Sequence, residues 1–181
     1  MKYAIIGCGL IGKKRLAALP SGSELAVACD LQKQRADDLA GFSKTGRSET
    51  DFTKAVIEPQ VEAVIVATLN STLAPIAAAA IRAGKHVLVE KPAGICSHEV
   101  SELQALAAHH GVKVRVGFNH RFHPAFQKAR EIFDSGALGP LMFLRGRYGH
   151  GGRIGYEKEW RADPKLSGGG ELIDQGVHLI D

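Results

Sequence analysis

The sequence is poor in cysteine and in aromatic residues, and it has no long apolar run. Its three cysteines, Cys8, Cys29 and Cys96, form an odd set without regular spacing. This argues against a disulfide framework and favours a reducing compartment, by default the cytoplasm. No apolar stretch approaches the roughly 20 residues that span a bilayer, and glycines interrupt the apolar N-terminus where a signal peptide would be continuous. We therefore expect a cytoplasmic protein with no membrane partner.

Charge of one sign does not accumulate in any segment. The net charge is +4 and the pI is about 9.0, but the lysines and arginines are scattered among acids. Binding of nucleic acid would favour a basic stripe with interleaved aromatic residues, so we expect no nucleic-acid partner. The positive charge is better suited to attracting an anionic cofactor or substrate.

Four histidines lie close together in the sequence and raise the question of a metal. They match no closed zinc pattern, and no cysteine lies near them; they are His109, His110, His120 and His123. No serine forms a recognisable nucleophile elbow with His178. We expect no metal site and no serine nucleophile.

The 21 glycines include one motif in an informative position. A short apolar strand at residues 3–6 runs into G-C-G-L-I-G, and a helical stretch follows to residue 19. The first glycine permits a tight turn, the second lets a pyrophosphate approach the backbone, and the third lets helix and strand pack closely. The start of the helix offers N–H groups and a positive dipole end to phosphate oxygens. The predicted cofactor-binding residues here are Gly7, Cys8, Gly9, Leu10, Ile11 and Gly12.

An acidic residue at the end of the next strand extends this pattern. Asp30 follows a predicted strand at residues 25–29, near the spacing of about 20 residues at which a carboxylate binds the adenosine ribose. A lone glycine motif could be no more than a tight connection, but here strand, glycines, helix, strand and acid occur in order. We predict a dinucleotide site that includes Asp30 and Leu31. The acid favours NAD over NADP, although Lys33 and Arg35 lie close enough to leave NADP open.

Strands and helices go on alternating after this unit. Near-continuous apolar strands are predicted at residues 61–67, 86–89 and 113–117, with helices at 72–83 and 97–110 between them. Such strands are typical of a parallel sheet that helices cover on both faces, so the fold class is α/β with a doubly wound sheet. Ligands of these sheets bind beyond the carboxyl ends of the strands. Two polar segments follow strands there: Thr68, Leu69, Asn70 and Ser71, and then Glu90, Lys91 and Pro92.

The glycine motif is followed in order by E-K-P, by G-F-N-H-R-F-H-P, by Trp160–Arg161 and by G-G-G-E-L-I-D-Q-G-V-H-L-I-D. This combination resembles the Gfo/Idh/MocA family of NAD(P)-dependent oxidoreductases over essentially the whole chain. The resemblance implies a Rossmann domain at residues 1–120 and, at residues 121–181, the beginning of an α+β substrate domain that commonly forms the subunit interface. It implies a dehydrogenase or reductase that transfers a hydride between the cofactor and a secondary hydroxyl or keto group of a sugar, polyol or related compound. A homo-oligomer is also implied.

The resemblance assigns roles to individual residues. Lys91 would reach the substrate hydroxyl and the nicotinamide, and Pro92 would follow a cis peptide bond. Asp174 and His178 would complete the active site, with His178 as general base or acid. The remaining predicted cofactor-binding residues are Thr68, Leu69, Asn70, Glu90, Lys91, Asn119 and Arg161.

The chemistry of these side chains suits the assignment. Oxidation of a secondary alcohol needs a base within reach of the hydroxyl, and histidine titrates near neutrality. Lys91 would favour the developing alkoxide. We expect Asp174, one helical turn before His178, to orient the imidazole ring or raise its basicity.

Each assignment has a structural alternative. Lys91 could be a solvated loop lysine, and Asp174 and His178 could be a surface pair. Trp160 could pack in the core or in an interface, and Arg161 could pair with an acid. Three further side chains could satisfy backbone groups at turns: Asn70, Asn119 and Arg121. One departure from the family pattern is Leu73, where many members have a histidine near the nicotinamide.

The last third of the chain should begin the second domain. We expect a helix at residues 124–135, a first strand at 140–148, a loop at 149–167 and a helix after the glycines. A lone strand would leave its edges exposed, so we expect the sequence to be a piece of a longer protein. Four residues could line a substrate pocket: Tyr148, His150, Arg153 and Tyr156. The alternative function is a non-catalytic NAD(P)-binding or sensing module. Neither the substrate nor the direction of reaction follows from the sequence.

Overall fold

Six parallel strands form the centre of the N-terminal part of the molecule. In the computed structural model, which describes residues 1–149 and 154–181, the sheet order is β3-β2-β1-β4-β5-β6. The strands are β1 Lys2–Ile6, β2 Glu24–Cys29, β3 Arg47–Glu49, β4 Ala63–Val66, β5 His86–Val89 and β6 Val114–Val116. Every neighbouring pair is parallel. This order is that of the Rossmann fold, in which the chain reverses its direction of travel across the sheet between β1 and β4.

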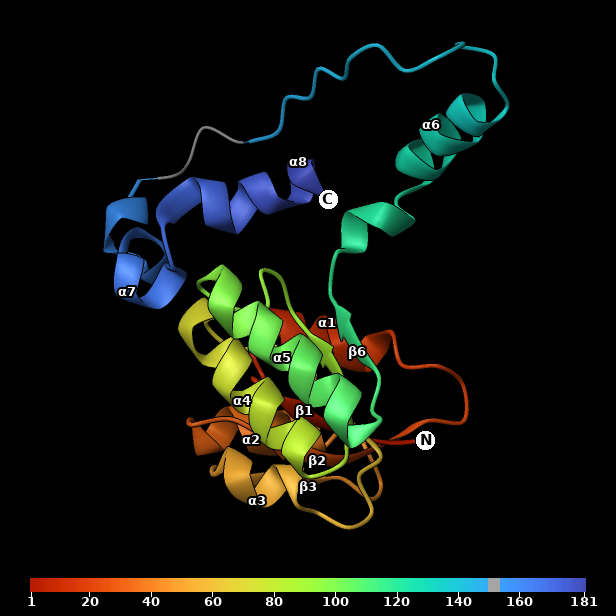
Figure 1. Cartoon of the computed structure of the whole chain (residues 1–181). Helices are drawn as coiled ribbons and strands as arrows, with labels where there is room; N and C mark the ends of the chain where they lie inside the picture. The colour runs from red at the N-terminus through yellow and green to blue at the C-terminus, as the bar shows by residue number, and fades with distance from the viewer. Residues whose placement is uncertain (150–153) are drawn as a thin grey trace.

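Helices pack on both faces of this sheet (Figure 1). They are α1 Leu10–Ala17, α2 Lys33–Ala40, α3 Phe52–Val56, α4 Asn70–Arg82 and α5 Ser97–His110. Alternate residues of β1 enter two separate clusters of buried side chains: Ala4 and Ile6 one, Ile5 the other. All four residues of β4 are buried. The apolar runs read from the sequence are therefore explained by burial on two faces.

The predicted strands and helices of this domain all form, and α5 and β5 have the predicted ends. Three elements were not predicted: α2, β3 and α3. β3 is the short polar segment Arg-Ser-Glu at the edge of the sheet, and an edge strand of this kind has no apolar pattern to reveal it.

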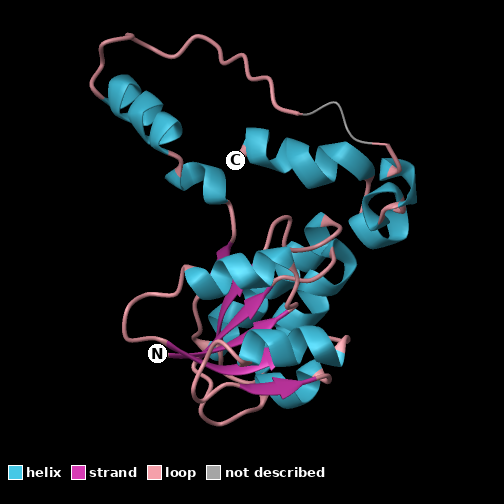
Figure 2. Cartoon of the chain, turned by 180° about the vertical axis from the view of Figure 1, so that it is seen from behind, coloured by secondary structure: helices cyan, strands magenta, loops and turns pink. Residues whose placement is uncertain are grey.

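The last part of the chain returns to the sheet after a long excursion. A 3₁₀ turn at Asn119–Phe122, called η1, leads into α6 at Pro124–Asp134, which projects away from the sheet (Figure 2). The later elements are the 3₁₀ turns η2 Tyr156–Lys158 and η3 Trp160–Ala162, α7 Pro164–Ser167, the π-helical turn η4 Leu172–Gly176 and α8 Val177–Ile180. The helix predicted after the glycines is thus present, with a π-helical first part.

Two predictions for this region are wrong. Residues 140–148 do not form a strand: the backbone from 141 to 149 is in neither helix nor strand, and its side chains are exposed. A strand needs a neighbouring backbone to hydrogen-bond with, and no described strand lies beside this segment. The described part of the predicted loop at 149–167 is also more ordered than expected, since it contains η2, η3 and α7.

Residues 154–181 form the returning segment, which is held against the start of α4 and the loop after β5. The side-chain amide of Asn70 donates to the carbonyl oxygen of Ser167 at 2.9 Å, and both residues are buried. A Cβ on Gly168 would lie 2.8 Å from Cβ of Ile95, so the two backbones approach closely there. No helix among the described residues is long and apolar enough to cross a membrane.

Candidate active site

Two of the three glycines in the loop between β1 and α1 have no room for a side chain. Gly7 has a φ of +94°, and a Cβ there would lie 2.3 Å from the carbonyl oxygen of Ala67. At Gly12 a Cβ would lie 2.0 Å from the carbonyl oxygen of Gly7. Around Gly9, by contrast, no described atom lies within 4 Å of the Cβ position. The protein itself needs Gly7 and Gly12, and Gly9 leaves open space for a ligand.

The start of α1 faces this open space. Gly9 is its N-cap, no described side chain caps the helix, and the first turn contains no acidic residue. The N–H groups and positive dipole end of an uncapped helix start are suited to an anion such as a pyrophosphate. The cradle therefore fits the phosphates of a dinucleotide.

The carboxylate of Asp30 ties the glycine loop to the end of β2. Its Oδ2 accepts a hydrogen bond from the backbone N–H of Cys8 at 2.8 Å, and its Oδ1 accepts one from the N–H of Gln32 at 2.9 Å. A carboxylate has about four lone-pair positions, so each oxygen keeps capacity for a ribose hydroxyl.

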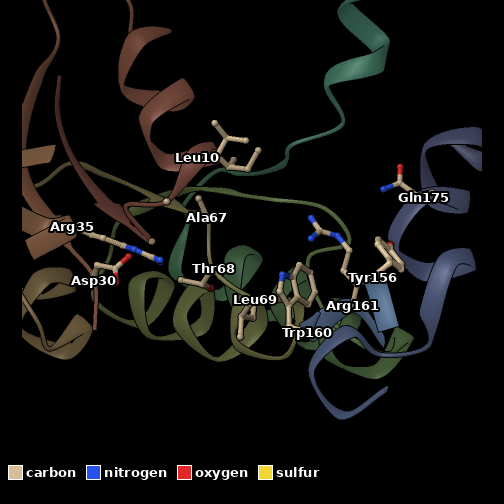
Figure 3. A pocket seen from close by; sticks show the side chains of 13 residues that line it. Leu10, Asp30, Arg35, Ala67, Thr68, Leu69, Tyr156, Trp160, Arg161 and Gln175 are labelled. Atoms are coloured by element: carbon tan, nitrogen blue, oxygen red, sulfur yellow. The ribbon is translucent and has the colours of Figure 1, made fainter. Parts of the chain in front are cut away.

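The two basic residues near Asp30 point to different places. Lys33 donates to Asp37 and, at 2.9 Å, to the hydroxyl of Ser48. Arg35 instead lines the cavity next to Asp30 (Figure 3). Of the two, Arg35 is the side chain placed to influence the choice between NAD and NADP.

A cavity of about 750 Å³ extends from the glycine loop to the returning segment. Asp30 and Arg35 lie at one end, Thr68 and Leu69 lie between, and the far end is lined by Tyr156, Trp160, Arg161 and Gln175 (Figure 3). The other lining residues are Gly7, Gly9, Leu10, Ile11 and Ala67. The volume is in the range of cofactor and ligand sites, which is about 300–1,000 Å³.

Lys91 and Asp174 meet beside this cavity. The ammonium nitrogen of Lys91 donates to Oδ1 of Asp174 at 2.7 Å and to its carbonyl oxygen at 2.5 Å. The other carboxylate oxygen accepts from Nε of Arg161 and from the amide of Gln175, both at 3.0 Å. Because Arg161 and Gln175 line the cavity, the pair adjoins its far end. The Lys91–Pro92 peptide bond is cis, as the resemblance implied.

Asp174 is 1% exposed and lies in the π-helical turn η4, a feature often found at functional sites. Burial works to raise its pKa, but the hydrogen bond and charge of Lys91, followed by the charge of Arg161, outweigh burial and hold the pKa below its usual value. The expectation that Asp174 orients His178 is not met, since its described hydrogen bonds go to Lys91, Arg161 and Gln175.

His178 lies next to this ionic cluster with an unusual imidazole. Its Nδ1 is buried and has no hydrogen-bond partner among the described residues. Burial lowers the pKa of the ring to about 4, the charges of His120 and Lys91 add to this, and Asp174 and Asp181 oppose it. The charge of Asp174 raises the pKa of His178, as expected, but burial outweighs it, and His178 is neutral at physiological pH.

Several predicted cofactor-binding residues lie outside the cavity lining. Asn70 is 3% exposed and bonds to Ser167, Asn119 is exposed at the start of η1, and Leu31 is 91% exposed. Cys8 contributes its backbone N–H to Asp30. Leu73, at the position of the family histidine, is fully buried in the core under the sheet.

Glu90 pairs with a helix instead of lining the cavity. Nε of Arg15, in α1, donates to Oε1 of Glu90 at 2.5 Å. A Cβ on Gly117 would lie 2.8 Å from the guanidinium of Arg15 and 3.0 Å from Oε2 of Glu90, so the glycine leaves room for the pair. The residue before Lys91 is thereby anchored to the helix that begins at the glycine loop.

The sequence missed Gln175 as a lining residue, because nothing in the pattern around it distinguishes an amide that faces a cavity from one that faces solvent. Among the four suggested pocket residues, Tyr156 lines the cavity. The ring centroid of Tyr148 lies 5.9 Å from that of His178. His150 and Arg153 lie outside the described residues.

Neither a metal cluster nor a reactive Cys8 thiol is found among the described residues. No group of three or more His, Cys, Asp or Glu side chains there could hold a metal ion. Burial, followed by the charge of Asp30, raises the pKa of the Cys8 thiol to about 12, so this thiol stays protonated.

Two family models match the chain in succession. Residues 1–118 match the model described as an oxidoreductase family with an NAD-binding Rossmann fold, and residues 126–181 match the GFO/IDH/MocA C-terminal domain. The chain belongs to the Gfo/Idh/MocA family. Its first part is the family's NAD-binding Rossmann domain, and the start of the family's C-terminal domain follows.

The curated relatives of the chain include inositol dehydrogenases. Inositol 2-dehydrogenase 2 of Saccharopolyspora erythraea is 30% identical over 185 residues, which cover 100% of this chain and 52% of the relative. The scyllo-inositol 2-dehydrogenase (NAD(+)) of Bacillus subtilis is 27% identical, with 100% and 52% covered. The chain spans about half the length of these relatives.

Solved structures of the family superimpose on the chain. GenD2 from gentamicin A biosynthesis, in complex with NAD, is 29% identical with a TM-score of 0.82 and covers 99% of this chain and 51% of its own. The scyllo-inositol dehydrogenase of Lactobacillus casei, with bound NAD(H) and scyllo-inositol, is 26% identical with a TM-score of 0.71 and covers 77% and 42%.

Proposed function

We propose that this protein is an NAD-dependent dehydrogenase that oxidises a secondary hydroxyl group of an inositol, sugar or related polyol. The observation that carries the proposal is the contact of Lys91 with Asp174 at the end of a cavity that begins at the glycine loop. A cofactor-binding module without chemistry would not need a buried acid that holds a lysine at that place.

The residues of the cavity fit a dinucleotide. The uncapped start of α1 and the open space at Gly9 would hold the pyrophosphate, and Asp30 would accept hydrogen bonds from the adenosine ribose. The far end, with Trp160 and Arg161, is left for the nicotinamide. Bound there, nicotinamide supplies the hydride acceptor. We propose NAD as the cofactor, because the carboxylate of Asp30 would repel a 2′-phosphate.

Lys91 is placed to hold the substrate oxygen. An ammonium group has three N–H donors, and two of them are used on Asp174. The third remains for a substrate hydroxyl, and the positive charge lowers the energy of the alkoxide that develops as the proton leaves. The two hydrogen bonds to Asp174 fix the lysine in position.

His178 would receive the proton of that hydroxyl. The ring is neutral above a pH of about 4, so it is ready to accept a proton at physiological pH. Its Nδ1 is buried, which leaves Nε2 as the nitrogen for the transfer. A base with a depressed pKa is a weaker acceptor, even with the charge of Asp174 already raising the value.

Turnover and cofactor binding, measured on the same variants, test the proposal. We expect NAD-dependent oxidation of at least one member of a panel of inositols and monosaccharides, followed by NADH absorbance. Lys91→Met and His178→Ala should each lower kcat by about 10²–10⁴-fold, while the Kd for NADH, from fluorescence titration, changes less than about threefold.

His98→Ala is the matched control, because His98 is exposed on α5 and should change neither quantity. Full turnover in both Lys91→Met and His178→Ala would refute the assigned roles. Binding of NADH without turnover on any substrate would favour a non-catalytic NAD-binding module.

A further inference from the structure

The imidazole of His120 stacks with the rings of two other elements, and one of these rings is the proposed base. The ring of His120, in η1, stacks on that of His178, in α8, with centroids 4.1 Å apart and planes at 24°. The His120 ring also stacks with Phe126 of α6 at 6.1 Å and 11°, and it meets Tyr148 edge to face at 5.1 Å. Phe118 and Tyr148 meet the His178 ring edge to face at 6.3 and 5.9 Å.

A second contact fixes η1 against the end of α8. Arg121, the residue after His120, donates from Nε to both carboxylate oxygens of Asp181 at 2.9 and 2.7 Å, and from its terminal nitrogen at 2.5 Å. The Asp181 side chain is 8% exposed. η1 and the end of α8 also lie together in Figures 1 and 2. This charge-assisted pair, formed by an Arg121 side chain that is 60% exposed, joins η1 to the end of α8 beside the stacked imidazoles.

The surroundings of His178 decide which of its nitrogens can work. Nδ1 is sealed from solvent and has no described partner. The charged or titratable groups that face the ring are His120 from η1, Lys91 from the loop after β5, Tyr148, and Asp174 and Asp181 from its own segment. Asp181 is also paired with Arg121. Of these groups, His120 is the one whose ring stacks on a face of the His178 imidazole.

We propose that His120 is a positioning residue for the reaction: its stacked imidazole covers one face of His178, keeps water from that face and holds the ring so that Nε2 points to the substrate. The inference rests on the proposed function only in naming His178 as the base. The placement of the two rings, and its effect on His178, can be measured without any turnover.

Removal of the stacked ring should be visible in the titration of His178. In wild type the pKa is about 4, with burial as its first cause and the charge of His120 as the next. We expect His120→Ala to raise it by one pH unit or more, because the variant admits water and removes a positive charge. His120→Phe keeps a stacked ring and should raise it by less.

Nuclear magnetic resonance of ¹⁵N-labelled imidazoles measures this shift, with His178→Gln used to assign the His178 signal. His98→Phe is the control and should leave the His178 titration unchanged. An unchanged His178 pKa in both His120→Ala and His120→Phe would overturn the inference. If His120→Ala does not fold, His120→Phe and His120→Gln provide the same comparison, and a larger shift for Gln than for Phe is expected.

Turnover gives a separate readout. Once a substrate is known, the acid limb of the pH profile of kcat/KM should move to higher pH in His120→Ala, by the same amount as the pKa of His178. The kcat should fall, and the KM for NAD should stay constant. A fall in stability alone would not move this limb. If no substrate is turned over, the proposed function fails, and the imidazole titration still decides whether His120 positions His178.

Discussion

Gly9 and Gly12 belong to one motif but differ in what surrounds them. Gly12 sits against the carbonyl oxygen of Gly7, at 2.0 Å from where a Cβ would be, whereas no described atom lies within 4 Å of the same position on Gly9. Gly9 also has an ordinary φ of −72°, so alanine can adopt its backbone. The two glycines therefore serve different purposes, one in folding and one in binding.

Alanine at each position separates the two purposes. We expect Gly12→Ala to lower the free energy of unfolding by about 3 kcal/mol, because the methyl group overlaps a backbone oxygen. Gly9→Ala should leave the free energy of unfolding within about 0.5 kcal/mol of wild type and weaken NADH binding by about tenfold or more. Urea denaturation and fluorescence titration measure the two effects. Equal losses of stability in both variants would contradict this division.

The roles of the glycines could be predicted from the sequence because each role follows from local spacing. The hydrogen-bond partner of Asp174 could not be predicted in this way. Asp174 and His178 are four residues apart, and that spacing predicted an interaction between them. The carboxylate instead bonds to Lys91, 83 residues away. Only tertiary folding brings the loop after β5 to η4, so local periodicity could not reveal the contact.

Among the elements, α4 and α7 are joined by a single buried hydrogen bond from Asn70 to Ser167. The sequence placed Asn70 at the cofactor, since it follows a strand at the ligand-binding edge of the sheet. In the structure Asn70 satisfies a backbone carbonyl group, which is the alternative that the sequence left open, because the returning segment reaches that edge as well.

Loss of this bond should loosen the returning segment. In Asn70→Ala the buried carbonyl of Ser167 loses its donor, which costs about 1–2 kcal/mol. We expect faster amide hydrogen exchange in α7 and η4, with β1 and β4 unchanged, measured by mass spectrometry. Asn119→Ala, at an exposed position, is the matched control. Unchanged exchange in α7 would show that other contacts hold the segment.

The strand expected at residues 140–148 illustrates the limit of sequence patterns at the level of elements. The segment contains exposed Leu141, Met142, Phe143 and Leu144, a composition typical of a strand. Secondary structure of this kind is formed between two backbones, and no described strand offers a second one. The buried strands β1, β4 and β5 had such neighbours and formed where predicted.

The stability of the whole molecule should depend on pH through His178. Its pKa is about 4 in the folded protein and about 6.5 in an unfolded chain, so the unfolded state binds more protons between these values. The free energy of unfolding should therefore fall as the pH is lowered from about 6.5 to about 4. Below that range protonation of Asp174, whose pKa is held low by Lys91 and Arg161, should add a further loss.

Replacement of His178 tests this origin of the slope. We expect His178→Gln to have a smaller decrease in the free energy of unfolding between pH 6.5 and 4.5 than wild type, because glutamine does not titrate. Urea denaturation followed by the fluorescence of Trp160, the single tryptophan, measures it. His98→Gln should keep the wild-type slope. An identical slope in His178→Gln would assign the pH dependence to other groups.

The cavity has two walls of different origin. One comes from the glycine loop and the ends of the strands, and the other comes from residues 156–175, which reach the sheet only after the excursion through α6. An occupant that touches both walls acts as a bridge between them. Binding energy that the occupant gains from residues 156–175 must, by thermodynamic reciprocity, also strengthen the packing of these residues against the sheet. Occupation of the cavity and docking of the returning segment are therefore one coupled equilibrium.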